Sequence, residues 1–164
     1  MDAAAKTGYQ ITLPSDTELV MTRTFNAPRE LVFRAHVDPA LIPQWWGWRH
    51  YTTTVETLDA RPGGKWHFVS RGPDDSVMNF FGEYREVVAP ERITWTFGYE
   101  GMPEGVEPGE ETYTFEEHDG RTTLTSYTRF KTKEERDGLL ATGMEDGANE
   151  SAERMDEMLA RLQE

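Results

Sequence analysis

The sequence of 164 residues contains no cysteine, which excludes disulfide bonds and thiolate metal sites and fits a reducing, cytoplasmic compartment. It has no run of 18 apolar residues, so no transmembrane helix is expected. No apolar segment near its start suggests a secretory signal. Positive charge is scarce, with 17 lysines and arginines against 30 aspartates and glutamates, a net charge of −13. Because nucleic acids and anionic membranes bind basic surfaces, we expect neither as a partner.

Motifs for nucleotide-dependent or nucleophilic chemistry are also missing. The sequence has no phosphate-binding G-x-x-x-x-G-K-[ST] loop, no G-x-G-x-x-G and no G-x-S-x-G elbow. Its four histidines, His36, His50, His67 and His118, form no H-x-H or H-E-x-x-H pattern. We therefore expect no metal site and no cofactor.

The most regular pattern is an apolar stripe over residues 143–163, in which apolar side chains recur at steps of three or four. This spacing predicts one face of an α-helix. The stripe consists of Met144, Ala148, Ala152, Met155, Leu159 and Leu162. Its first half is small, including Gly143, Gly147 and Ser151, so either sheet backbone or a ligand can approach it closely. Thr142 followed by Glu145 predicts a capping box at the helix start.

Strands dominate the chain before this helix. Residues 19–25 predict one strand. Pro28 predicts the first position of a helix. Asp38-Pro39 predicts the start of a second short helix, which ends at the tryptophans 45, 46 and 48. Six further strands are expected at 51–58, 65–70, 79–88, 92–99, 111–117 and 121–130, and Thr132 with Glu135 predicts another capping box. Strands grouped apart from helices predict an α+β fold with an antiparallel sheet.

Two segments fall outside this pattern. Residues 1–17 are interpreted as an N-terminal arm, or as an extra edge strand around 9–13, leaving residues 18–164 as the domain. Residues 98–111 contain four glycines, two prolines and five glutamates. They predict a solvated surface loop or, alternatively, a lip over a cavity.

An ordered set of fragments resembles a known family. The fragments are R-T-F-N-A-P at 23–28, D-P at 38–39, W-W-G at 45–47, D-A-R-P-G-G at 59–64, G-E-Y-R-E-V at 82–87, P-E-R-I at 90–93 and the closing segment 143–159. Together they resemble START-like, or SRPBCC, domains, and more narrowly the branch named after the C-terminal domain of the heat-shock-protein-90 ATPase activator. The resemblance covers about residues 19–163.

The resemblance implies a helix-grip fold, in which a curved antiparallel sheet of about seven strands wraps a long C-terminal helix around a cavity. Two departures are visible. The family commonly has Gly-Pro after the paired tryptophans, where this chain has Gly47-Trp48. The separate N-terminal domain of the activator is not matched, which weighs against a full co-chaperone role.

Alternation along the expected strands places many aromatic side chains on faces that this fold would turn toward the helix. With the small helix residues they predict a largely apolar pocket with a few polar groups. The predicted ligand-binding residues are Trp45, Trp46, Trp66, Phe68, Tyr84, Glu86, Trp95, Phe97, Tyr113, Phe115, Gly147, Ser151 and Met155. The alternative is a solid core in which the same aromatics fill the space.

Glu86 shares the parity of Gly82 and Tyr84, so it is predicted to point inward. Burial would raise the pKa of its carboxyl group and suit it to acid–base chemistry. A structural role, in which Glu86 pairs with a nearby arginine, is the alternative that we favour.

Three functions follow as hypotheses. The first is binding of a small hydrophobic or amphipathic molecule, without catalysis. The second is a protein-interaction module directed to a chaperone, as the family branch and an exposed tryptophan cluster would suggest. The third is an enzyme of the aromatase/cyclase or hydrolase kind, with Glu86 as acid or base and Tyr84 or Tyr113 as its partner. The ligand and the choice between monomer and homodimer stay open.

Overall fold

The structure is a computed structural model that describes residues 8–102 and 104–164. Within these residues, one antiparallel sheet of eight strands has the order β1-β2-β8-β7-β6-β5-β4-β3. The strands are β1 (Gln10–Thr12), β2 (Glu18–Phe25), β3 (Thr52–Leu58), β4 (Lys65–Arg71), β5 (Val77–Val88), β6 (Arg92–Tyr99), β7 (Gly109–His118) and β8 (Arg121–Arg129). The helices are α1 (Arg29–Val37), α2 (Ile42–Trp45), α3 (Lys133–Leu140) and α4 (Met144–Leu162).

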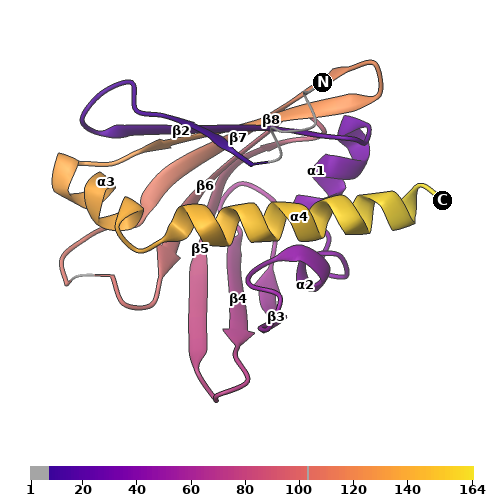
Figure 1. The fold of residues 1–164 in the computed structure, drawn as a ribbon. Helices are drawn as coiled ribbons and strands as arrows, with labels where there is room; N and C mark the ends of the chain where they lie inside the picture. The colour runs from indigo at the N-terminus through magenta and orange to yellow at the C-terminus, as the bar shows by residue number, and fades with distance from the viewer. Residues whose placement is uncertain (1–7, 103) are drawn as a thin grey trace.

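The long helix α4 lies across one face of the curved sheet, as Figure 1 shows. Helix α3 lies at the end of the sheet where α4 begins, and α1 and α2 lie nearer the C-terminal half of α4. The α+β helix-grip fold expected from the strand pattern and the resemblance is thus confirmed. None of the helices in the described ranges is long and apolar enough to cross a membrane.

The strands expected between residues 19 and 130 are found within two residues of their predicted bounds. The sheet has eight strands rather than about seven because β1 pairs with β2 at its edge. This short strand agrees with the second interpretation of the N-terminal segment, whereas residues 1–7 of the expected arm lie outside the described residues.

One of the predicted helix starts is correct and the others are wrong. Thr132 caps α3, since its side-chain oxygen accepts a hydrogen bond from the Glu135 N–H at 3.1 Å. Thr142 does not cap α4, because its hydroxyl instead donates to the Leu139 carbonyl at 2.6 Å. The residue before α4 is Gly143, with φ of +82°, a backbone conformation that glycine adopts without a steric cost. Pro28 likewise precedes α1 rather than opening it, because the helix begins at Arg29. The second short helix, α2, begins at Ile42 rather than at Asp38-Pro39, because Asp38 instead ends α1.

A dense aromatic core fills the space between the sheet and the bulky half of the α4 stripe. Trp66 of β4 stacks on Trp95 of β6 with ring centroids 4.2 Å apart. Met155, Met158 and Leu159 of α4 are buried in the same cluster. Burial of these large side chains stabilises the docking of α4 on the sheet.

Candidate functional site

A cavity of about 950 Å³ lies between the sheet and the first half of α4. Its helical wall consists of Met144, Gly147, Ala148, Ser151, Ala152 and Met155. The sheet contributes Leu19 and Met21 of β2, Ser70 of β4, Met78 and Phe80 of β5, Phe97 and Tyr99 of β6, Gly109, Glu111 and Tyr113 of β7, and Ser126 and Thr128 of β8. The small half of the helix stripe therefore faces open space, and the bulky half faces the solid core.

The entrance to the cavity lies where lining residues are also exposed to solvent. Most of these come from the β6–β7 loop (Glu100, Gly101 and Glu107), from α3 (Glu134 and Gly138) and from the start of α4 (Thr142 and Gly143), and Trp48 is exposed as well. The three segments lie at the same end of the sheet in Figure 1. The loop between β6 and β7, which the sequence offered as a lip, thus borders the entrance.

Helix α4 also holds the tryptophan segment in place. The Ser151 hydroxyl accepts a hydrogen bond from the Gly47 N–H at 2.9 Å. The Arg154 guanidinium donates to the carbonyls of Trp46 and Gly47, each at 3.1 Å. These bonds satisfy backbone groups of an irregular segment and position the neighbouring rings on the cavity wall.

The predicted ligand-binding residues divide between this cavity and the core. Seven line the cavity: Trp45, Trp46, Phe97, Tyr113, Gly147, Ser151 and Met155. Five are buried among the core aromatics and are absent from the cavity wall: Trp66, Phe68, Tyr84, Trp95 and Phe115. Part of the aromatic face therefore lines an open pocket, and the rest fills a solid core.

The prediction that Glu86 points inward is wrong. The pairing of β5 with β6 shifts between Tyr84 and Glu86, so the side-chain alternation changes there. As a result Val87 packs against the core, and Glu86 lies outside the cavity. Its carboxylate accepts two hydrogen bonds from Arg92, at 2.8 and 3.0 Å. This is the structural arginine pair that we favoured, and the ion pair lowers the pKa of Glu86 rather than raising it.

Glu111 is the carboxylate that the cavity does contain, and the sequence analysis missed it. Its Oε1 accepts a hydrogen bond from the Trp95 indole N–H at 2.8 Å, and its Oε2 accepts one from the Ser126 hydroxyl. The hydroxyl of Tyr113 interacts with the same carboxyl group. Burial raises the pKa of Glu111, and the three donors oppose that rise.

A signal for Glu111 was present in the alternation of β7. Glu111 has the parity of Tyr113 and Phe115, both of which point inward. It also ends a stretch rich in glycine and glutamate, and this composition is typical of a solvated loop. The strand predicted at 111–117 already contained Glu111, and the observed strand begins at Gly109, so the parity argument applies to Glu111.

His36 of α1 forms another polar part of the wall. Its Nδ1 lies 2.8 Å from the Val32 carbonyl, which can only accept, so this nitrogen carries the proton. The ring packs among Trp45, Tyr113 and Phe115, with centroids 5.1 to 5.3 Å away. Burial lowers the pKa of His36 from 6.5 to about 4. The imidazole is therefore neutral at neutral pH.

This shift predicts a pH dependence of folding stability. As pH falls below 6.5 the unfolded chain takes up a proton at His36, whereas the folded protein does not do so until about pH 4. The contribution of His36 to the unfolding free energy is therefore fully present above pH 6.5 and is lost as the pH falls from 6.5 toward 4. We expect wild-type protein to lose roughly 2 kcal/mol more unfolding free energy than His36→Phe between about pH 7.5 and about pH 5.

The measurement is urea unfolding of both proteins at several pH values. The variant serves as the reference for every other titratable group, because the two proteins differ only at residue 36. Parallel pH curves for the two proteins would contradict the assignment to His36.

The remaining chemistry of the cavity is hydrogen bonding and proton exchange. In the described part of the chain, no group of three or more His, Asp or Glu side chains is arranged to hold a metal ion. A buried carboxyl group with a raised pKa, beside a tyrosine hydroxyl, can accept or donate a proton. The same groups can equally orient a bound molecule.

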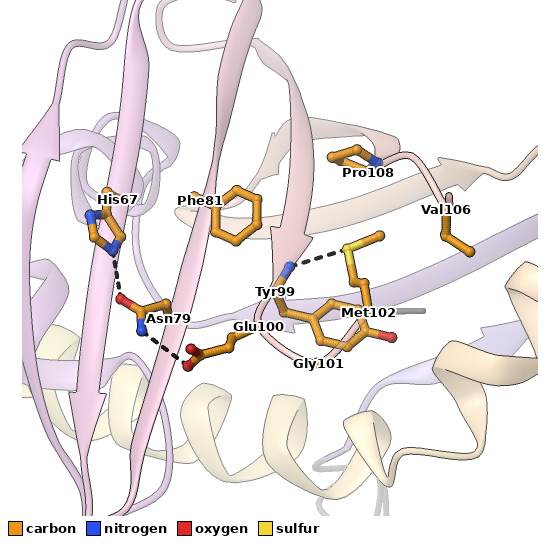
Figure 2. Close-up of a pocket in the computed structure, with 9 residues that line it drawn as sticks. All are labelled: His67, Asn79, Phe81, Tyr99, Glu100, Gly101, Met102, Val106 and Pro108. Carbon is orange, nitrogen blue, oxygen red and sulfur yellow. Dashed lines mark hydrogen bonds between the residues drawn. The ribbon is translucent and has the colours of Figure 1, made fainter. Parts of the chain in front are cut away.

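A second, smaller pocket of about 460 Å³ lies on the outer face of β4–β6, away from α4 (Figure 2). In it, His67 Nε2 lies 2.7 Å from Asn79 Oδ1, and the Asn79 amide donates to Glu100 at 3.0 Å. Phe81 is exposed beside them. Glu100, Gly101, Met102 and Val106 line both pockets, so the β6–β7 loop separates the outer pocket from the cavity.

Comparison with known proteins agrees with this architecture. Residues 26–160 match the family model described as activator of Hsp90 ATPase homolog 1-like protein. A crystal structure from Rhodobacter sphaeroides is 27% identical, with a TM-score of 0.86 over 94% of this chain and 99% of that one. A second, from Mycobacterium smegmatis, is 26% identical, with a TM-score of 0.82 over 92% and 95%. A search of curated proteins finds no match.

Proposed function

The chain belongs to the family of activator of Hsp90 ATPase homolog 1-like proteins, within the START (SRPBCC) superfamily, and from this premise we propose that it binds a small hydrophobic or amphipathic molecule. The observation that carries the proposal is the cavity of about 950 Å³ beside the small half of α4. Its wall is mostly apolar and aromatic, with a few placed polar groups, as in small-molecule sites generally.

The tryptophan cluster supports ligand binding better than docking of a chaperone. Trp45 and Trp46 are buried, and both line the cavity. Trp48 is exposed, but it too lines the cavity and lies beside Gly147 of α4. An anchor for a protein partner would present its ring outward, so the two buried rings, Trp45 and Trp46, favour a small molecule.

An enzymatic role would have to rest on Glu111 and Tyr113, because Glu86 lies outside the cavity. Those two groups already contact each other and Ser126, an arrangement that also suits recognition of a polar group. We therefore propose binding without turnover as the function.

Two measurements test the proposal. Native mass spectrometry of gently purified protein is expected to show a bound species or a defined complex after addition of a ligand. Titration with N-phenyl-1-naphthylamine, a neutral apolar fluorophore, is expected to give saturable fluorescence. A protein that carries nothing and binds no apolar probe would remove the proposal.

Filling the cavity from its helical wall should remove probe binding. Ala148 lines the cavity, whereas Ala160 lies on the exposed face of the same helix. We expect Ala148→Phe to weaken probe binding roughly tenfold or more. The same change should leave stability unaltered, or raise it by up to about 1 kcal/mol, because the new ring buries apolar area.

Ala160→Phe is the matched control, since it makes the same change on the same helix away from the cavity. We expect it to bind the probe like wild type. Ser151 is a poorer position for this test, because its hydroxyl is bonded to Gly47 and its replacement would leave that backbone N–H without a partner. Equal probe affinity in Ala148→Phe and Ala160→Phe would show that the probe binds elsewhere.

A further inference from the structure

The charged groups of the cavity wall are of one sign. Among the described residues that line it, none is lysine or arginine. Five are glutamates: Glu100, Glu107, Glu111, Glu134 and Glu135. His36, the titratable ring on the wall, is neutral at neutral pH. An anionic headgroup entering this cavity would meet carboxylates and no cation, which is strongly unfavourable in a site of low polarity.

Glu111 stands apart from the four other glutamates. They come from the β6–β7 loop and α3, near solvent, and Glu107 is already paired with Lys131 at 2.7 Å. Glu111 comes from a central strand, and none of its partners among the described residues is a cation. A carboxylate offers about four acceptor positions, and the hydrogen bonds from Trp95 and Ser126 take two of them. A buried carboxylate without a counter-charge is costly, and a cationic ligand group would remove that cost.

Nearby cations of the protein are engaged with other groups. On the inward face of β2, which also carries the cavity residues Leu19 and Met21, Arg23 is buried. Its guanidinium forms a bidentate pair with Asp156 of α4, at 3.0 and 2.8 Å. Arg154 is directed to the backbone carbonyls of the tryptophan segment. Among the described residues, no lysine or arginine is therefore paired with the Glu111 carboxyl group in the cavity.

The aromatic wall suits the same kind of ligand. Trp45, Trp46, Tyr99 and Tyr113 present rings to the cavity. The face of an aromatic ring attracts a desolvated cation, and tryptophan does so most strongly. The aromatic rings and the carboxylate together replace the hydration that an organic cation loses when it leaves water.

We infer that the cavity takes an amphipathic amine, whose apolar body lies against the aromatic wall and whose protonated nitrogen is received by Glu111. This inference rests on the proposed function and narrows it to one ligand class. Fatty acids and phosphorylated lipids are excluded by the same charges that admit an amine.

The test compares three molecules that share one apolar body and differ in the head: dodecylamine, dodecanol and dodecanoate. Each displaces N-phenyl-1-naphthylamine from the protein at concentrations below its critical micelle concentration. In the wild-type protein we expect the amine to bind about tenfold or more tightly than the alcohol, and dodecanoate to bind most weakly.

Glu111→Gln keeps the size and the acceptor oxygen of the side chain and removes its charge, so it should reduce the preference for the amine over the alcohol to within about twofold. Glu110→Gln is the matched control. It removes the same charge one residue away, on the exposed outer face of β7, and should keep the wild-type preference.

The outcomes separate this inference from the proposed function. If the probe binds but the three dodecyl compounds compete equally, or dodecanoate binds best, the inference is wrong and apolar ligand binding stands. The same holds if Glu111→Gln retains the wild-type preference for the amine. If neither the probe nor any dodecyl compound binds, the proposed function itself fails. The ranking of the three dodecyl compounds on the wild-type protein tests the inference even if the Glu111→Gln variant does not fold.

Discussion

Gly82→Ala is expected to destabilise the protein by roughly 3 kcal/mol or more, or to prevent folding, although it adds a single methyl group. A Cβ atom at this position would lie 1.8 Å from the Thr96 carbonyl oxygen and 2.6 Å from Trp66 Nε1. That carbonyl is itself the acceptor for the Trp66 indole N–H, at 3.1 Å. The methyl group would therefore push β5 away from β6 and break a buried hydrogen bond.

The measurement is thermal and urea unfolding, and the expected fall in melting temperature is roughly 6–12 °C for a chain of this size. Gly138→Ala supplies the control, because nothing lies within 4 Å of a Cβ at that position in α3. It should stabilise the protein by up to about 1 kcal/mol, since alanine favours helix more than glycine does. A Gly82→Ala protein that melts like wild type would show that β5 and β6 are not so close.

Leu159→Ala is the second large effect, with an expected loss of roughly 2–5 kcal/mol. Leu159 is 2% exposed and belongs to the core cluster beneath the bulky half of α4. Its truncation removes apolar burial and leaves a hole among large, rigid aromatic side chains, which cannot easily close around it.

Leu162→Ala makes the same chemical change one turn further along α4, where the side chain is 43% exposed. It should cost less than about 0.5 kcal/mol. Urea unfolding of both variants measures the difference, and helix propensity cancels because each replaces leucine by alanine. Similar losses for the two variants would mean that α4 does not dock on the sheet by the face described.

Local patterns in the sequence were enough to predict the elements and the fold. Alternation along the strands, the apolar stripe over 143–163 and the order of family motifs together predicted the α+β helix-grip architecture, which the structure confirms. The gradation of that stripe from small to bulky residues also corresponds to the division between cavity and core. Periodicity succeeds here because each element buries one regular face.

The prediction of side-chain direction from alternation along a strand failed where the backbone departs from regular geometry. The shift in β5 pairing after Tyr84 turns Glu86 outward to Arg92, and no residue pattern announced it. The left-handed Gly143 moved the start of α4 past the Thr142 capping box. Such irregularities depend on how neighbouring strands and helices meet.

Residue patterns alone were sufficient to predict the family, the order of strands and helices, and an aromatic face opposite a small helix face. They could not separate the aromatics that border open space, such as Trp46 and Phe97, from those that fill the core, such as Trp66 and Phe115; the packing in three dimensions does so. It also decided that Glu111, rather than Glu86, is the carboxylate in the cavity. The physical reason is that burial and hydrogen-bond partners depend on the space between elements far apart in the chain, whereas periodicity reports one element at a time.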